Sequence, residues 1–257
     1  DRGFQFGDGI YEVIRTYHGQ PFQLDAHLAR LERSAKAIEL SLPWSVQQWA
    51  THVRDGITRS GYTESKVYLQ LTRGAAPRDH VFPTAAQPTA VMTVREMKPL
   101  DPILQASGVS VMTMDDWRWG RCDIKSVNLL PNIMARQKAK QAGAFEAVFI
   151  RNGQVTEGAV SNAMIVKAGC VFTAPEGERI LSGVTRTIVL ELARKEGLPV
   201  EERFVTLDEL LRADEIFLTG TTVEVLPVIR VDGKPIGSGK PGSVTQKLQA
   251  AFQRFVG

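Results

Sequence analysis

The stretch DIKSVN, residues 123–128, places one lysine, Lys125, among aliphatic neighbours just ahead of an expected helix. That helix should run from about Leu130 to Gln141, because Pro131 suits a first turn and Gly143 lies just past the end. A buried lysine at this point would present a neutral, nucleophilic amine. The alternative is a surface lysine whose alkyl stem lies along apolar neighbours.

A carboxylate follows in VTEG, residues 155–158, directly after a hairpin turn expected at Asn152-Gly153. On local sequence alone, Glu157 could be a turn carboxylate in contact with water. It could also accept a hydrogen bond from a protonated ring nitrogen of a bound molecule. The sequence therefore supplies an amine before the expected helix and an acid after it.

Two loops offer groups that bind phosphate. SGVT, residues 182–185, opens an expected helix, so the amides of Val184 and Thr185 point toward an anion at its N-terminus. GTT, residues 220–222, follows an expected strand and adds the hydroxyl of Thr221. Simple capping and an ordinary loop are the alternatives. An amine, an acid and phosphate-binding amides are together the groups that hold pyridoxal 5′-phosphate.

Four further residues carry weaker signals. Arg30 lies on an expected helix and could supply the cation that a phosphate needs. Arg78 and His80 stand two residues apart in an expected loop, where they could bind a carboxylate by charge and hydrogen bonds. Tyr11, on an expected strand, could direct its hydroxyl into a pocket. The alternatives are an exposed helix face, a solvated loop and a packing tyrosine.

Composition limits the classes of function. Of the 257 residues, 43% are hydrophobic and 23% charged, with a net charge of +3, and no basic run of the kind that binds nucleic acid is present. Two cysteines outside any CxxC pair make a metal site or a disulfide framework unexpected and fit a reducing cytoplasm. We expect no membrane span and no signal peptide. The chain opens at Asp1 within a glycine-rich segment, so a short N-terminal piece is expected to be missing.

Strand and helix patterns are mixed along the chain, which predicts an α+β protein of two domains. A smaller N-terminal domain is expected at 1–97, a linker around two prolines at 98–104, and a larger C-terminal domain at 105–257. Asp25 is expected to cap the first long helix, and residues 159–166 are expected to form a strand.

Taken together, these segments resemble the class IV, or fold type IV, pyridoxal-phosphate aminotransferases, and within them the D-amino acid aminotransferases that act on D-alanine-like donors. The matching stretches cover nearly the whole chain: residues 1–13, 27–31, 73–80, 121–126, 155–158, 183–186 and 219–224. The resemblance implies a two-domain α+β fold with the active site at the domain interface and the cofactor on the larger domain. It also implies that the family's first strands precede Asp1.

The resemblance assigns cofactor roles to matched residues. Lys125 would form the Schiff base and, once released by substrate, move a proton between the substrate Cα and the cofactor C4′. Glu157 would pair with the pyridine nitrogen, and Leu181 would pack against the ring. The residues that would hold the phosphate are Arg30, Val184, Thr185 and Thr221, the second and third through their amides.

Substrate roles follow in the same way. Tyr11, Arg78 and His80 would bind the substrate carboxylate, with Arg78 and His80 reaching in from the partner subunit of a homodimer. Branched-chain L-amino acid aminotransferases and aminodeoxychorismate lyases, the alternatives of the same fold, do not typically carry this Arg-x-His pair. D-amino acids are therefore the expected donors, with 2-oxoglutarate or pyruvate as the 2-oxo acid acceptor. A cofactor-binding protein without catalysis is the remaining alternative.

One short run and two single residues depart from the family pattern. The serine-rich run after the glutamate reads GAVS at 158–161, and Gly220 stands where a serine is usual near the phosphate. Asp79 adds an acid between Arg78 and His80. These departures leave the expected cofactor unchanged and bear on side-chain preference and rate.

Overall fold

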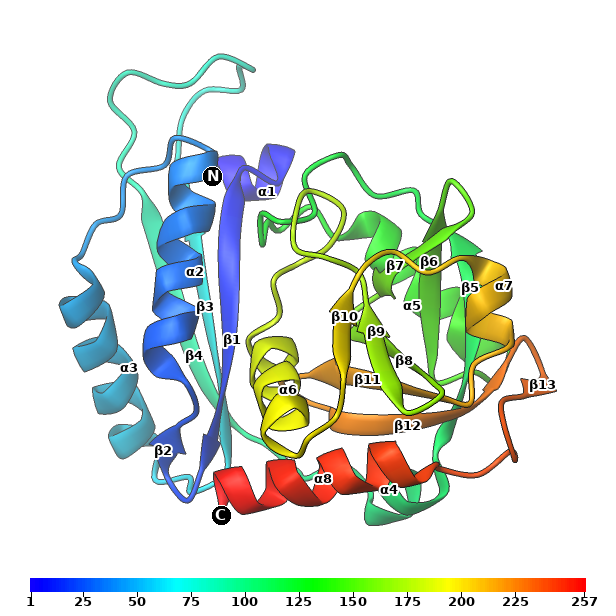
Figure 1. Ribbon diagram of the computed structural model, residues 1–257. Coiled ribbons are helices and arrows are strands. Elements are labelled where there is room, and N and C mark those ends of the chain that lie inside the picture. The colour runs from blue at the N-terminus through cyan, green and yellow to red at the C-terminus, as the bar shows by residue number, and fades with distance from the viewer. The chain divides into compact units, whose positions relative to one another are not determined.

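The structure is a computed structural model that describes residues 1–257 (Figure 1). The chain forms two compact units, the first from residues 1–98 and 124–129 and the second from residues 99–123 and 130–257. Helices and strands are mixed in both units, so the expected α+β class is confirmed. None of the helices combines the length and the apolar character that crossing a membrane requires.

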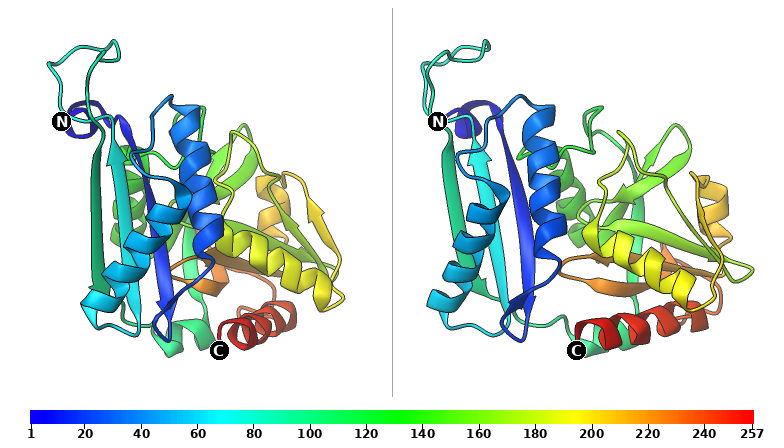
Figure 2. Two further views of the ribbon diagram at one scale, coloured as in Figure 1. Left: turned by 90° about the vertical axis from the view of Figure 1, so that its left-hand side faces the viewer. Right: turned by 60° about the vertical axis from the view of Figure 1, so that its left-hand side comes forward.

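The first unit is an antiparallel sheet with two helices packed on one face (Figure 2). Its strands follow the order β2-β1-β3-β4, and α2 and α3 lie against each other and against the sheet. Its elements are α1 (Arg2–Phe6), β1 (Gly9–Tyr17), β2 (Gln20–Pro21), α2 (Leu24–Ala37), α3 (Val46–Ser60), β3 (Ser65–Thr72) and β4 (Thr89–Glu96).

The core of this unit is formed by hydrophobic residues that recur at helical spacing on α2 and alternate on β1. Leu24, Leu28 and Leu31 recur at helical spacing along α2 and are buried. Ile10 and Ile14 are fully buried on β1 and pack in the same cluster. Because one helix stripe and one sheet face bury each other, the register of β1 determines which of its side chains point toward α2.

The start of α2 differs from the prediction that Asp25 caps it. The cap residue is Gln23, which has a left-handed backbone with φ of 49° and makes no side-chain capping bond. Asp25 lies instead in the first helical turn, where its charge interacts favourably with the helix dipole. The tight β2 hairpin brings the chain into the helix two residues earlier than the polar pattern indicated.

The second unit is a mixed sheet of nine strands surrounded by five helices. Eight strands follow the order β10-β9-β8-β11-β12-β5-β6-β7, and β13 pairs with β12. Its elements are α4 (Pro102–Ser107), β5 (Val109–Asp115), α5 (Leu130–Gln141), β6 (Glu146–Arg151), β7 (Gln154–Gly158), β8 (Asn162–Lys167), β9 (Cys170–Thr173), α6 (Val184–Lys195), β10 (Val200–Glu202), α7 (Leu207–Leu211), β11 (Glu215–Gly220), β12 (Glu224–Val231), β13 (Lys234–Pro235) and α8 (Ser243–Val256).

Two segments of this unit depart from expectation. The strand predicted at 159–166 begins only at Asn162, because residues 158–161 fold into a turn closed by a 2.8 Å hydrogen bond from the Gly158 amide to the Ser161 carbonyl. Helix α4 begins at Pro102, inside the segment 98–104 expected as a linker. Asp101 caps it by accepting a hydrogen bond from the Ile103 amide, and a proline is well suited to the first helical position.

Candidate active site

The segment that carries Lys125 is held by the first unit on both sides. The Tyr11 amide on β1 donates to the Lys125 carbonyl at 2.9 Å, and the Val127 amide donates to the Gly9 carbonyl at 3.0 Å. From the other side, the Lys125 amide donates to the Ser34 hydroxyl of α2 at 3.2 Å. The backbone of Lys125 is therefore fixed between a strand and a helix.

The Lys125 side chain lies over an aromatic ring. Its Nζ atom is 4.3 Å from the centroid of the Tyr11 ring, and the side chain is half-buried. The Tyr11 ring in turn lies 5.7 Å from that of Tyr68, whose hydroxyl donates to Gln70 Oε1 at 2.6 Å. Burial raises the pKa of Tyr68, so this hydroxyl stays protonated at neutral pH. The structure thus brings together two residues that the sequence singled out separately.

Arg30 is buried on α2 in a bidentate ion pair with Glu12. Its Nε and Nη2 atoms lie 2.7 and 2.8 Å from the two Glu12 carboxylate oxygens. His27 Nδ1 lies 2.8 Å from the same carboxylate. Burial opposes ionisation of Glu12, but Arg30 and His27 outweigh it and hold its pKa well below the usual range. Burial also lowers the pKa of His27, so a neutral imidazole donates from Nδ1 to the Glu12 carboxylate.

Sequence reasoning missed Glu12 and His27, although a signal for Glu12 exists. Glu12 lies between Ile10 and Ile14 in the alternation of β1, so all three side chains occupy one face. A carboxylate in phase with two core isoleucines must be paired when it is buried. The pairing fixes the guanidinium of Arg30 in one orientation.

Glu157, at the end of β7 in the second unit, is buried and surrounded by donors. Asn162 Nδ2 donates to one carboxylate oxygen at 2.9 Å, and the Leu181 amide donates to both oxygens at 3.1 and 3.0 Å. Arg118 Nη1 donates to the carboxylate as well. Burial raises the pKa of Glu157 despite these donors. A buried carboxylate of this kind suits a cationic N–H group.

The start of α6 in the same unit presents uncapped backbone amides. Gly183 is the cap residue and no side chain caps the helix, so the first amides, those of Val184 and Thr185, keep their hydrogen-bonding capacity for an anion. A Cβ atom at Gly183 would lie 2.0 Å from Asn162 Oδ1, so this approach requires glycine. Asn162 therefore links the helix start to Glu157.

A buried hydroxyl without a partner lies close to this helix start. Thr219 on β11 pairs in register with Asn162 on β8, and its Oγ1 atom is buried without a hydrogen-bond partner. Thr221 follows directly after the same strand and is half-buried. An unpaired buried hydroxyl costs free energy unless a bound molecule supplies a partner. The uncapped amides and this hydroxyl fit a phosphate group, and Glu157 fits a protonated ring nitrogen.

The loop that carries Arg78 and His80 projects beyond the end of the first unit's sheet (Figures 1 and 2). Its backbone is held by Arg2, whose Nη1 atom donates to the Asp79 carbonyl at 2.5 Å. The Arg78 guanidinium and the His80 ring lie 4.9 and 5.3 Å from the Phe6 ring centroid. Both residues are exposed, and no hydrogen bond or ion pair joins them to Tyr11 or Lys125.

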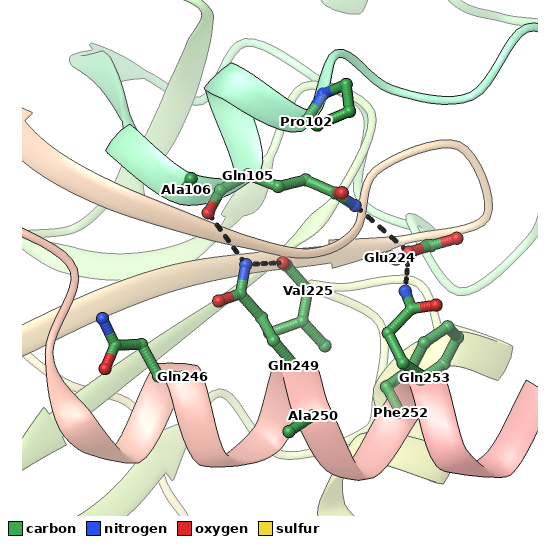
Figure 3. Close-up of a pocket in the computed structure, with 10 residues that line it drawn as sticks. All are labelled: Pro102, Gln105, Ala106, Glu224, Val225, Gln246, Gln249, Ala250, Phe252 and Gln253. Carbon is green, nitrogen blue, oxygen red and sulfur yellow. Dashed lines mark hydrogen bonds between the residues drawn. The ribbon is translucent and has the colours of Figure 1, made fainter.

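A separate hollow of about 420 Å³ lies between α4, α8 and the start of β12 (Figure 3). Glu224 there accepts hydrogen bonds from Gln105 Nε2 at 3.2 Å and Gln253 Nε2 at 2.7 Å. Its backbone is left-handed, with φ of 56°. None of the predicted site residues lines this hollow. The two glutamine bonds hold the turn that follows Thr221 and so help to place that threonine.

Glu146, which neighbours the 158–161 turn, gives a prediction for stability against pH. Its carboxylate is fully buried and accepts a 2.6 Å hydrogen bond from the Val160 amide; Oε2 has no hydrogen-bond partner and lies 3.9 Å from Arg136 Nη1. Burial raises its pKa from 4.5 to about 7, and the nearby Glu157 carboxylate adds to this effect. Between these two pH values the folded protein holds a proton that the unfolded chain has released, so stability falls as pH rises through this window.

We therefore expect Glu146→Gln to be more stable than wild type at pH 8 by up to about 3 kcal/mol, with the difference vanishing below pH 4.5. Urea unfolding at several pH values measures it. Glu178→Gln, at an exposed position, is the control and should not change the pH dependence. A pH-independent difference for Glu146→Gln would contradict the assignment.

Comparison with known proteins gives a consistent set of similarities. The family model described as amino-transferase class IV matches residues 9–231. A D-alanine aminotransferase of Bacillus licheniformis is 48% identical over 257 residues, covering 100% of this chain and 90% of that protein. One from Staphylococcus haemolyticus is 40% identical over 258 residues, with 100% and 91% covered.

The similar solved structures are also aminotransferases. The branched-chain amino acid aminotransferase of Escherichia coli superposes with a TM-score of 0.92 at 28% identity, covering 99% of this chain and 88% of that one. A branched-chain amino acid aminotransferase from T.th., solved with pyridoxamine 5′-phosphate, gives 0.91 at 29% identity, with 99% and 87% covered.

Proposed function

Because the chain belongs to the class IV aminotransferase family, we propose that it transfers the amino group of a D-amino acid such as D-alanine to a 2-oxo acid such as 2-oxoglutarate or pyruvate. The observation that carries this proposal is the 48% identity to a D-alanine aminotransferase over the whole chain. The branched-chain enzymes share the fold at 28–29% identity, which supports them less well as a guide to substrate.

The enzymes of this family depend on pyridoxal 5′-phosphate, which supplies an aldehyde for the amino group and a protonated ring that withdraws electrons from the substrate Cα. Glu157 is proposed to hold the proton on the ring nitrogen, with Leu181 beside it. The proposed phosphate ligands are Arg30, Val184, Thr185, Thr221 and, added by the structure, Thr219. The unpaired Thr219 hydroxyl and the uncapped amides of α6 support this assignment.

Lys125 is proposed to carry the cofactor at rest and to move the proton at the substrate Cα during turnover. The 4.3 Å separation between its Nζ atom and the Tyr11 ring supports a fixed position for the amine. The three backbone hydrogen bonds to the 125–127 segment restrict it further. A proton carrier needs such a fixed position, because transfer requires hydrogen-bonding distance to the reacting atom.

The substrate carboxylate is proposed to bind Tyr11 and, in a homodimer, Arg78 and His80 of a second copy. The exposure of Arg78 and His80, and the projection of their loop beyond the sheet, support a role outside their own unit (Figure 2). The Arg2 contacts to the Asp79, His80 and Val81 carbonyls hold the loop in shape. A preshaped loop loses less entropy on binding than a mobile one.

The proposed donor class is tested by single half-reactions. The protein loaded with pyridoxal phosphate is mixed with D-alanine or with L-leucine, and the loss of visible absorbance and the 2-oxo acid released are both followed. We expect D-alanine to react at least about 10²-fold faster, as expected when a charged contact is made by one substrate and lost by the other. Faster reaction with L-leucine would favour the branched-chain alternative, and a protein that takes up no cofactor would favour a non-catalytic role.

The shared site gives a second prediction. At a donor concentration well below the wild-type KM, Lys125→Ala and Arg78→Ala are each expected to be nearly inactive, the second through a donor KM raised about 10- to 100-fold. If each site takes Lys125 from one copy and Arg78 from the other, a refolded 1:1 mixture contains mixed dimers with one intact site. The mixture should regain about a quarter of wild-type turnover. No recovery in a mixture that contains mixed dimers by mass spectrometry would contradict the shared site.

A further inference from the structure

We propose that Arg118 is a positioning residue that keeps the Glu157 carboxylate ionised and oriented, and so determines whether the cofactor's ring nitrogen keeps its proton. This inference rests on the proposed function and adds a residue to which the sequence analysis gave no role. Arg118 follows β5 and reaches Glu157 at the end of β7 within the second unit.

Every edge of the Arg118 guanidinium is occupied by a protein group. Nε and Nη2 each lie 2.9 Å from a different Asp116 carboxylate oxygen, and Nη1 donates to Glu157. Nη2 also donates to Thr156 Oγ1 at 3.3 Å. One face of the group lies 4.6 Å from the Phe149 ring centroid. The arginine is therefore clamped, and the direction in which it presents charge to Glu157 is fixed.

Four charged side chains meet here, and their net charge is zero only when Glu157 is ionised; they are Asp116, Arg118, Arg151 and Glu157. Asp116 pairs with Arg118 and also with Arg151, whose Nη2 atom is 3.0 Å away. The side chains of Asp116, Arg118 and Glu157 are at most 7% exposed. Two guanidinium groups and two carboxylates give zero net charge, which a buried site tolerates. Without Arg118, Asp116 would keep Arg151, whereas Glu157 would lose the cation that contacts it and would gain a proton.

The other donors to Glu157 cannot replace this effect. Asn162 Nδ2 and the Leu181 amide orient the carboxylate but carry no charge. Burial raises the pKa of Glu157, and the charge of Arg118 is the strongest influence that opposes it. A protonated Glu157 would donate its proton in a hydrogen bond to a neutral ring nitrogen instead of accepting one. The ring would then withdraw electrons less strongly.

The test compares Arg118→Met, which keeps the bulk and removes the charge, with Arg118→Lys. Arg151→Met is the matched control, because Arg151 binds the same Asp116 but does not contact Glu157. The first readout is the carbon-13 signal of the Glu157 carboxyl group in the cofactor-free protein, assigned with Glu157→Gln. At pH 7 we expect a carboxylate signal in wild type, in Arg151→Met and in Arg118→Lys, which keeps the positive charge, and a carboxylic acid signal in Arg118→Met.

The second readout is the nitrogen-15 shift of ring-labelled pyridoxal phosphate in the loaded protein. We expect a protonated ring in wild type and Arg151→Met and an unprotonated ring in Arg118→Met, with kcat lowered about 10²-fold. An ionised Glu157 in folded Arg118→Met overturns the proposal. If Arg118→Met does not fold, the equally uncharged Arg118→Gln takes its place, and an ionised Glu157 in that variant overturns the proposal. Failure of this proposal can be distinguished from failure of the proposed function, because the carbon-13 measurement on Glu157 needs neither cofactor nor substrate.

Discussion

Turnover is expected to fall by about 10³-fold or more when Lys125 is replaced by alanine, because the proposed function uses its amine both to attach the cofactor and to carry the proton. The variant should also lose the visible absorbance that a covalently attached cofactor gives. Borohydride reduction of wild type followed by peptide mass spectrometry should place the label on Lys125. Activity is measured by coupled detection of the 2-oxo acid product.

The control for this prediction is Lys66→Ala, which removes a half-buried lysine from β3 of the same unit. It should retain turnover, absorbance and labelling. Circular dichroism checks that both variants fold. Turnover retained by Lys125→Ala, or a label on another peptide, would remove the basis for the proposed function.

The second large effect is on stability. Glu12→Gln should lower the free energy of unfolding by about 3–5 kcal/mol, because it leaves Arg30 buried without its counter-charge. The hydrogen bonds from Arg30 and His27 to Glu12 would also lose a charged acceptor. Urea unfolding of the cofactor-free protein measures the change directly, without contribution from bound ligand.

Glu64→Gln is the matched control, since Glu64 also pairs with an arginine of the first unit. Its partner Arg15 is 3.8 Å away and the Glu64 side chain is 31% exposed, so the loss should stay below about 1 kcal/mol. Equal losses in the two variants would show that burial of the Glu12–Arg30 pair does not carry the effect.

Local chemistry made much of the fold predictable. The helix expected from Leu130 to Gln141 and the hairpin at Asn152-Gly153 are both confirmed, because proline and glycine restrict the backbone whatever surrounds them. The turn at 158–161 was not predictable in this way. Its shape depends on the Val160 amide reaching Glu146, a residue from another strand.

In the candidate site, too, some features were predictable from local sequence and others depend on long-range contacts. Lys125 and Tyr11 were singled out from sequence, and the structure adds the contact between them. The roles of Glu12 and Arg118 were missed because each depends on an ion pair with a residue distant in the chain. Arg118 meets Glu157 across 39 positions, and Glu12 meets Arg30 across 18. The spacing of hydrophobic residues within one element does not predict such a pairing, although the alternation of buried side chains on β1 could have indicated Glu12.

The return of residues 124–129 to the first unit has a consequence for biosynthesis. During synthesis, residues 1–98 leave the ribosome before the segment whose Ile124 side chain completes their core. That unit must therefore wait for at least 31 more residues, through Leu129, before it can close. Nascent chains arrested before this point should be protease-sensitive, and a gene fragment ending at Lys98 should yield an incomplete product.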